Sequence, residues 1–253
     1  MDNVPTNYRP KITDGSAPNN DRLFRNNNDG TFTDVTLQAG ITIEGFGLGL
    51  SVSDLNLDGW PDIYVSYDYV DDDFIYVNNQ DGTFTESAAK YLNHISQFAM
   101  GNDIADINND THPDIMVVDM APEEHERQML FSMTKNYDKF MMKLKMHYLP
   151  SYVRNTLQLN NGNGSFSEIG QLAGIHQTDW SWAPLLADFD NDGYKDLFVS
   201  NGYPKDIMNR DFLVYNKYAT SFQSVKKPAS LEEQHRFKLQ AINELQGAKI
   251  PNY

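Results

Sequence analysis

Three short segments of the chain concentrate carboxylate and amide side chains at alternate positions. They span residues 54–62, 106–114 and 188–196, and each follows the pattern Asp-x-[Asp/Asn]-x-Asp-x-x-x-Asp. Oxygen donors at every second position of a curled chain can converge on one point. Calcium suits this arrangement because it takes six to eight oxygen ligands at roughly 2.3–2.6 Å.

Each segment is expected to bind one ion through the side chains at places 1, 3, 5 and 9 and the backbone carbonyl at place 7. The predicted ligands are Asp54, Asn56, Asp58, Trp60 and Asp62 in the first segment, Asp106, Asn108, Asp110, His112 and Asp114 in the second, and Asp188, Asp190, Asp192, Tyr194 and Asp196 in the third. The sequence therefore predicts up to three Ca²⁺ ions.

Two other interpretations fit these segments less well. Asp/Asn/Gly runs can be plain turns, but carboxylates crowded into nine residues repel one another unless a cation is present. An EF-hand needs a Glu at place 12 and flanking helices, whereas place 12 here is Val65, Val117 or Val199. Thr111 stands where the other two segments have Gly, so weaker binding is expected in the second segment.

The segments belong to a longer internal repeat. A turn such as Asn28-Asp29-Gly30-Thr31-Phe32 lies 25 residues before each first Asp, and an aromatic residue lies eight before it. Apolar runs follow each segment, and extended residues precede each turn. First aspartates are 52 and then 82 residues apart, so the second interval contains an insertion. Features held in one register three times indicate a repeat architecture.

Each repeat is predicted to form about four short strands, the content of one propeller blade. The predicted fold class is all-β, a partial β-propeller of about three four-stranded blades with helical insertions. We expect a single domain over residues 1–253, with repeats at about 21–73, 74–119 and 154–203, a helical insertion at 120–153 and a helical C-terminal segment at 204–253.

Composition excludes several classes of function. A net charge of −15 argues against nucleic-acid binding, and the absence of cysteine excludes disulfides and thiolate zinc sites. No apolar stretch is long enough to span a membrane, and the first residues do not resemble a signal peptide. No catalytic constellation is evident. Asp119 and the glutamates that follow it are interpreted as the solvated start of a helix.

These motifs resemble a known family. Phe46-Gly47-Leu48-Gly49 before an Asp-x-Asn-x-Asp-Gly-x-x-Asp loop is similar to the FG-GAP/VCBS repeats of integrin-α-like propellers. Residues 23–36 resemble bacterial members that often carry an ASPIC/UnbV segment, which is not visible here. The resemblance covers about residues 20–119 and 154–203. It implies a calcium-binding propeller, which usually has about seven blades, so we expect the remaining blades in a longer chain.

The function expected from the sequence is a calcium-binding repeat module of a cell-surface or secreted protein that binds a protein or glycan ligand. An extracytoplasmic location is favoured because cytosolic calcium is too low to fill sites of the affinity expected for extracellular modules. Two alternatives stay open. The chain could be part of a propeller-based polysaccharide-active enzyme, or it could be a structural spacer.

Overall fold

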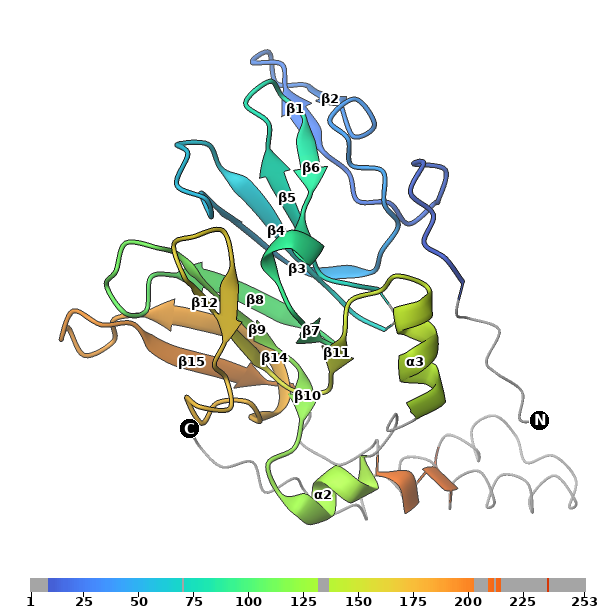
Figure 1. The fold of residues 1–253 in the computed structure, drawn as a ribbon, viewed down its shortest axis with the longest axis vertical. Coiled ribbons are helices and arrows are strands. Elements are labelled where there is room, and N and C mark those ends of the chain that lie inside the picture. The colour runs from blue at the N-terminus through green and yellow to red at the C-terminus, as the bar shows by residue number, and fades with distance from the viewer. Residues whose placement is uncertain are drawn as a thin grey trace, which may run out of the picture.

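A computed structural model describes residues 9–69, 71–131, 137–202, 209–211, 213–214 and 236. Most of the regular structure in these residues is β, arranged as several small and mainly antiparallel sheets (Figure 1). The all-β, propeller-like fold expected from the sequence is therefore confirmed. Among the described residues, no helix has both the length and the apolar character needed to cross a bilayer.

Two sheets are complete and have four antiparallel strands each. The first consists, in order, of β3 (Gly47–Ser53), β4 (Asp62–Tyr67), β5 (Phe74–Asn78) and β6 (Phe84–Glu86). The second consists, in order, of β8 (Gly101–Ala105), β9 (Asp114–Val118), β12 (Thr156–Asn160) and β13 (Phe166–Glu168).

Two partial sheets flank the complete ones. One is the hairpin of β1 (Phe24–Asn26) and β2 (Phe32–Asp34). The other has the order β10 (Met120–Ala121), β14 (Asp179–Ala187) and β15 (Asp196–Asn201). A short parallel pair joins β7 (Ile95–Ser96) to β11 (Ser151–Tyr152).

The number of complete four-stranded sheets in the described residues is two, not the expected three. The reason is that a sheet does not coincide with a sequence repeat. Each complete sheet joins the hairpin around one Asp-rich loop to the hairpin around the turn of the next repeat. Three repeats therefore yield two complete sheets and a half-sheet at either end of the series.

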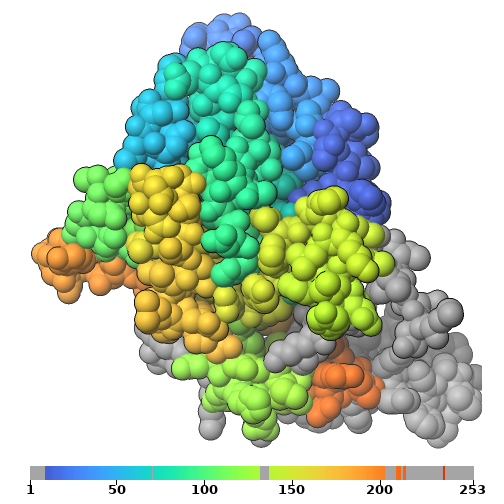
Figure 2. Space-filling model, in the orientation of Figure 1, coloured from blue at the N-terminus to red at the C-terminus, as the bar shows by residue number. Residues whose placement is uncertain are grey.

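Within the described ranges, three helices with assigned bounds lie outside the sheets. They are α1 (Ala88–Tyr91), α2 (His125–Leu130) and α3 (Tyr137–Lys145). The last two belong to the insertion between β9 and β12, and Figure 2 shows α3 on the surface beside the N-terminal segment. The predicted helical C-terminal segment, 204–253, lies almost entirely outside the described residues.

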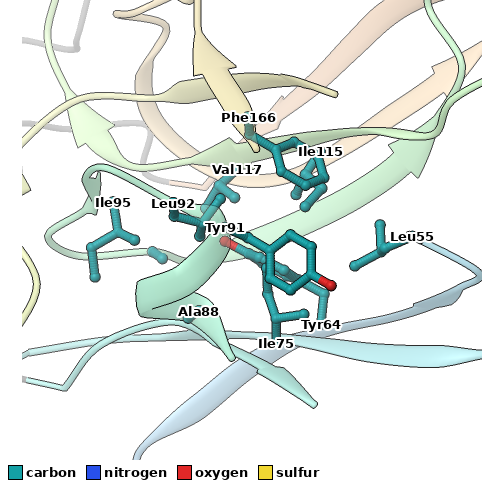
Figure 3. Close-up of a cluster of buried hydrophobic side chains, with 11 residues drawn as sticks. Leu55, Tyr64, Ile75, Ala88, Tyr91, Leu92, Ile95, Ile115, Val117 and Phe166 are labelled. Carbon is teal, nitrogen blue, oxygen red and sulfur yellow. The ribbon is translucent and has the colours of Figure 1, made fainter. Parts of the chain in front are cut away.

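The largest part of the core lies between the two complete sheets (Figure 3). Tyr64 and Ile75 of the first sheet meet Ile115 and Val117 of the second, and Tyr91 of α1 packs beside them. Alternate side chains of a strand point to opposite faces, so β4 also places Val65 toward the β1–β2 side. The inner strands are thus buried on both faces, and stacking of neighbouring sheets holds the series together.

Candidate metal sites

The first Asp-rich loop connects β3 to β4 and is held in shape by its own side chains. Asp54 accepts hydrogen bonds from the backbone nitrogens of Asp58, at 3.0 Å, and Gly59, at 2.7 Å. Asn56 Oδ1 accepts from Asp58 N, and Asp58 Oδ1 accepts from Trp60 N. These bonds curl the chain, so the side chains at places 1, 3 and 5 lie on the inside of one turn.

The second and third loops repeat this scaffold bond for bond. Asp106 accepts from the backbone nitrogens of Asp110 and Thr111, at 3.1 and 2.8 Å. Asp188 accepts from those of Asp192 and Gly193, at 3.1 and 3.0 Å. The residue at place 7 is positioned alike in all three loops, through a bond from its backbone nitrogen to the carboxylate at place 5.

Thr111 adopts the conformation that glycine provides in the other loops. Its φ is 72°, compared with 88° for Gly59 and 94° for Gly193. A β-branched residue in this left-handed region is strained, so the second loop keeps the common shape at an energetic cost.

The third loop brings three carboxylates together most clearly. One oxygen from each of Asp188, Asp190 and Asp196 lies within 4.8 Å of the others. Two oxygens on one calcium ion, each at 2.3–2.6 Å, can be separated by up to about 5 Å, so the donor set fits that ion. In the first two loops place 3 is asparagine, and its amide nitrogen bonds the carboxylate at place 5.

The closing aspartates anchor each loop to its sheet. Asp62 and Asp114 are fully buried, and each accepts one bond from a loop nitrogen and one from the backbone of an asparagine on the third strand. Burial raises the pKa of both carboxyls, and the neighbouring loop aspartates raise it further. From the described residues Asp196 accepts only the loop bond, from Phe189 N at 2.9 Å, and it is exposed.

The three loops lie along one rim of the molecule, on the left in Figure 1. Asn109 in the second loop donates from its side chain to the Gly193 carbonyl in the third, at 3.0 Å. Asn160 of β12 donates to the Leu55 carbonyl in the first loop, at 3.0 Å. Direct and strand-mediated contacts therefore join the candidate sites into one row.

Comparison with known proteins agrees with this arrangement. The family described as FG-GAP-like repeat matches residues 12–65, 54–117 and 148–199, which together cover more than half of the chain. The chain belongs to the FG-GAP-like repeat family. Each of the three matched segments ends within the strand that follows an Asp-rich loop, and the second segment also includes the loop of the first. A search of curated proteins found no matching relative.

A group of buried acids in this FG-GAP-like chain was not anticipated from the sequence. Asp71, Asp72 and Asp73, between β4 and β5, are at most 5% exposed. Asp73 accepts bonds from Tyr64 Oη, at 2.7 Å, and from Tyr67 N, at 3.0 Å. Burial raises the pKa of Asp73 to about 7. The signal in the sequence that could have indicated this group is the run of three consecutive aspartates between two apolar strands.

Asp119 overturns a second expectation. It does not stand at a solvated helix start but is fully buried, directly after β9. One of its oxygens accepts bonds from Ser96 Oγ and from the backbone nitrogens of Gln97, Phe98 and Arg154. Burial raises the pKa of Asp119 to about 6, although these bonds oppose the increase. The residue ties the β7–β11 region to the second sheet.

Proposed function

We propose that this chain is a calcium-binding FG-GAP-type module of a secreted or cell-surface protein and that it acts in protein or glycan binding. The observation that supports this most is the common scaffold of the three loops, in which the same bonds hold oxygen donors at places 1, 3 and 5. A loop that served only as a turn would not need several negative charges on its inner side.

The ligands of each site follow from the loop order. Places 1, 3, 5 and 9 supply side-chain oxygens, and the carbonyls of Trp60, His112 and Tyr194 complete the sets. Bound calcium would neutralise the loop carboxylates and link the two strands that each loop connects. The ions would then stiffen the hairpins β3–β4, β8–β9 and β14–β15. This is expected of a binding module whose surface must keep its shape.

Exposed aromatic rings at the loop rim support a role in binding. Trp60 and Tyr194 occupy place 7 of the first and third loops and are 45% and 58% exposed. Such rings supply large, rigid contact surfaces for proteins and stack on the apolar faces of sugars. The loop rim is therefore the surface we assign to the ligand.

A calorimetric titration of the EDTA-treated chain tests the metal assignment. We expect calcium to bind with a stoichiometry of up to three and to raise the melting temperature, and magnesium to be much less effective. The double change Asp188→Ala, Asp192→Ala should remove one site, whereas Asp138→Ala on α3 should remove none. No heat and no shift of the melting temperature with calcium would contradict the assignment.

The affinity in the same titration bears on the location. Dissociation constants of about 10⁻⁴–10⁻³ M are characteristic of extracellular calcium modules. Values in this range would support an extracytoplasmic location. Submicromolar values would match a cytosolic sensor or buffer instead and would contradict it.

A panel of glycans and polysaccharides distinguishes binding from catalysis. The proposal predicts retention on at least one ligand, without turnover, and reduced retention for Trp60→Ala and Tyr194→Ala. Leu172→Ala, at an 88% exposed side chain away from the loops, is the matched control. Turnover that a single substitution outside the loops abolishes would favour the enzyme alternative. The failure of every ligand, protein or glycan, would favour the spacer.

A further inference from the structure

The two half-sheets at the ends of the series are complementary. In the complete sheets, the second strand is paired with both the first and the third strand. β15 is the equivalent of the second strand, and among the described residues nothing pairs with its edge opposite β14. β1 is the equivalent of the third strand, and its edge opposite β2 also has no partner in the described part of the chain. Each half-sheet thus has the strands that the other lacks.

Side-chain burial shows the same complementarity. Phe198 lies ten residues after the first Asp of its loop, as Tyr64 and Met116 do, and those two are at most 1% exposed while Phe198 is 54% exposed. Phe24 lies five residues before the second residue of its turn, Asp29, and Tyr76 and Gln158 have the same place in their repeats. Those two are 1% exposed, and Phe24 is 54% exposed. Repeat positions that are covered within the series are therefore uncovered at its ends.

The polar groups match as well. In both complete sheets an asparagine on the third strand donates its backbone nitrogen to the closing aspartate, Asn78 to Asp62 at 2.9 Å and Asn160 to Asp114 at 2.8 Å. No described residue supplies this donor to Asp196. The equivalent asparagine is Asn26 at the end of β1. Its backbone nitrogen is the group that would donate the second hydrogen bond to the Asp196 carboxylate.

A hollow lies beside β1, where a preceding sheet would place the hairpin of its first and second strands. It is lined by Leu23 next to β1 and by Leu48, Leu50, Ile63 and Val65 of the first complete sheet. Leu50 in this lining is 67% exposed, and Val52, further along β3, is 61% exposed. The residues equivalent to Ile63 and Val65 in the second sheet are Ile115 and Val117, and these pack against Tyr64. Phe198 is the counterpart of Tyr64, so it has the right place to fill the hollow.

We propose that β15 of one copy of this chain pairs with β1 of a second copy to form a composite sheet in the order β14, β15, β1, β2. The register transferred from the complete sheets is Leu197↔Phe24, Phe198↔Leu23 and Val199↔Arg22. Two such junctions close a head-to-tail ring of six sheets, two complete ones from each copy and two composite ones. Propellers typically have about 4–8 blades, so this ring is of an ordinary size.

The same pairing does not occur within one copy. β1 and β15 lie at opposite ends of the series, with both complete sheets between them (Figure 1). A ring closed by one copy would contain three sheets, which is below the usual range. The competing arrangement is that further repeats of a longer chain cover the two ends, and the experiment below separates it from a pair of copies.

Cysteine cross-linking tests both the partner and the register, since the chain has no cysteine of its own. Directly opposite residues of paired antiparallel strands have Cβ atoms about 4.5–5.5 Å apart, which is close to the range for a disulfide. We expect a mixture of the Phe198→Cys and Leu23→Cys variants to form a covalent heterodimer under mild oxidation. Either variant alone should not cross-link, because its two cysteines lie in different junctions.

Two further measurements complete the test. The unmodified chain should sediment as a dimer, and Phe198→Arg or Leu50→Arg should convert it to a monomer with unchanged circular dichroism. Leu172→Arg, in an exposed turn outside both ends, should stay dimeric. A monomeric unmodified chain, or a dimer that neither arginine variant weakens, would overturn the proposal. Cross-linking of Leu172→Cys with Leu23→Cys as efficient as that of the designed pair would do the same.

Discussion

At the scale of single residues, the difference between the second loop and the other two reduces to one side chain. Thr111 and Gly193 occupy the same place with φ values of 72° and 94°. Strain of this kind costs a residue with a Cβ about 1–2 kcal/mol, and the greater freedom of glycine in the unfolded chain offsets roughly 0.5–1 kcal/mol of any gain. We therefore expect Thr111→Gly to stabilise the fold by less than about 1 kcal/mol.

The reverse change serves as the partner measurement. A Cβ added at Gly193 would meet nothing within 4 Å, so Gly193→Thr tests backbone strain without a steric clash. The same two contributions apply with opposite sign, so we expect it to destabilise the fold by less than about 1 kcal/mol, and urea denaturation of both variants measures the pair. Thr111→Gly should also tighten calcium binding at the second loop. Backbone strain acts with or without calcium. Stability changes that appear only in the presence of calcium would therefore contradict a backbone origin.

Asp73 gives the clearest expectation for pH dependence. The pKa of this carboxyl is about 7 in the folded chain, above its ordinary value of 3.8, so the folded state keeps the proton to higher pH. The stability that it contributes is complete below about pH 4 and is lost as the pH rises toward 7. Asp71 and Asp119, each with a pKa raised to about 6, add to the same loss.

Asp73→Asn should remove most of this residue's share of the pH dependence. The asparagine oxygen can still accept from Tyr67 N, and its amide can donate to Tyr64 Oη. At pH 8 the variant should be more stable than the parent by an amount on the order of 3 kcal/mol, measured by urea denaturation between pH 5 and 8. Asp138→Asn, on the exposed side of α3, should leave the profile unchanged. An identical slope in parent and Asp73→Asn would contradict this account.

At the scale of elements, Asn160 of β12 connects two parts of the fold. Its side-chain amide is buried and donates to the Leu55 carbonyl in the first loop and to the Pro113 carbonyl beside the second, at 3.0 and 3.2 Å. Removing it leaves both carbonyls short of a donor, so Asn160→Ala should cost about 1–3 kcal/mol. Asn78→Ala is the matched control, because in the described part of the chain its amide donates only to the exposed Pro61 carbonyl. A smaller loss for Asn160→Ala than for Asn78→Ala would contradict the connecting role.

The elements also show where prediction from sequence succeeds and where it ends. The loops could be predicted because their chemistry is local, with all ligands inside nine residues, and a repeated spacing exposes the strands around them. The partner of each strand is not local. That β4 pairs with β5 of the next repeat, and that Asp119 ends in the core rather than in solvent, depends on how the sheets stack. Local composition carries little information on that stacking.

At the scale of the whole molecule, stability should vary along the series of sheets. The second complete sheet has neighbours on both faces, and every residue of β9 is buried. All residues of β1 and β2 are exposed, and β15 has no fully buried residue. Amide protection follows burial and local packing. Hydrogen exchange should therefore be slowest in β9 and fastest in the two half-sheets, whereas uniform protection would contradict a series that is open at its ends.

The same experiment separates an open series from a closed pair of copies. If β15 pairs with β1 of a second copy, its backbone amides gain partners only in the dimer. Protection of residues 197–199 should then rise with protein concentration, while that of β9 stays the same. The Phe198→Arg variant should lose the concentration dependence and keep the protection of β9. A concentration effect of equal size in β9 and β15 would indicate global stabilisation instead, and would count against strand pairing at this edge.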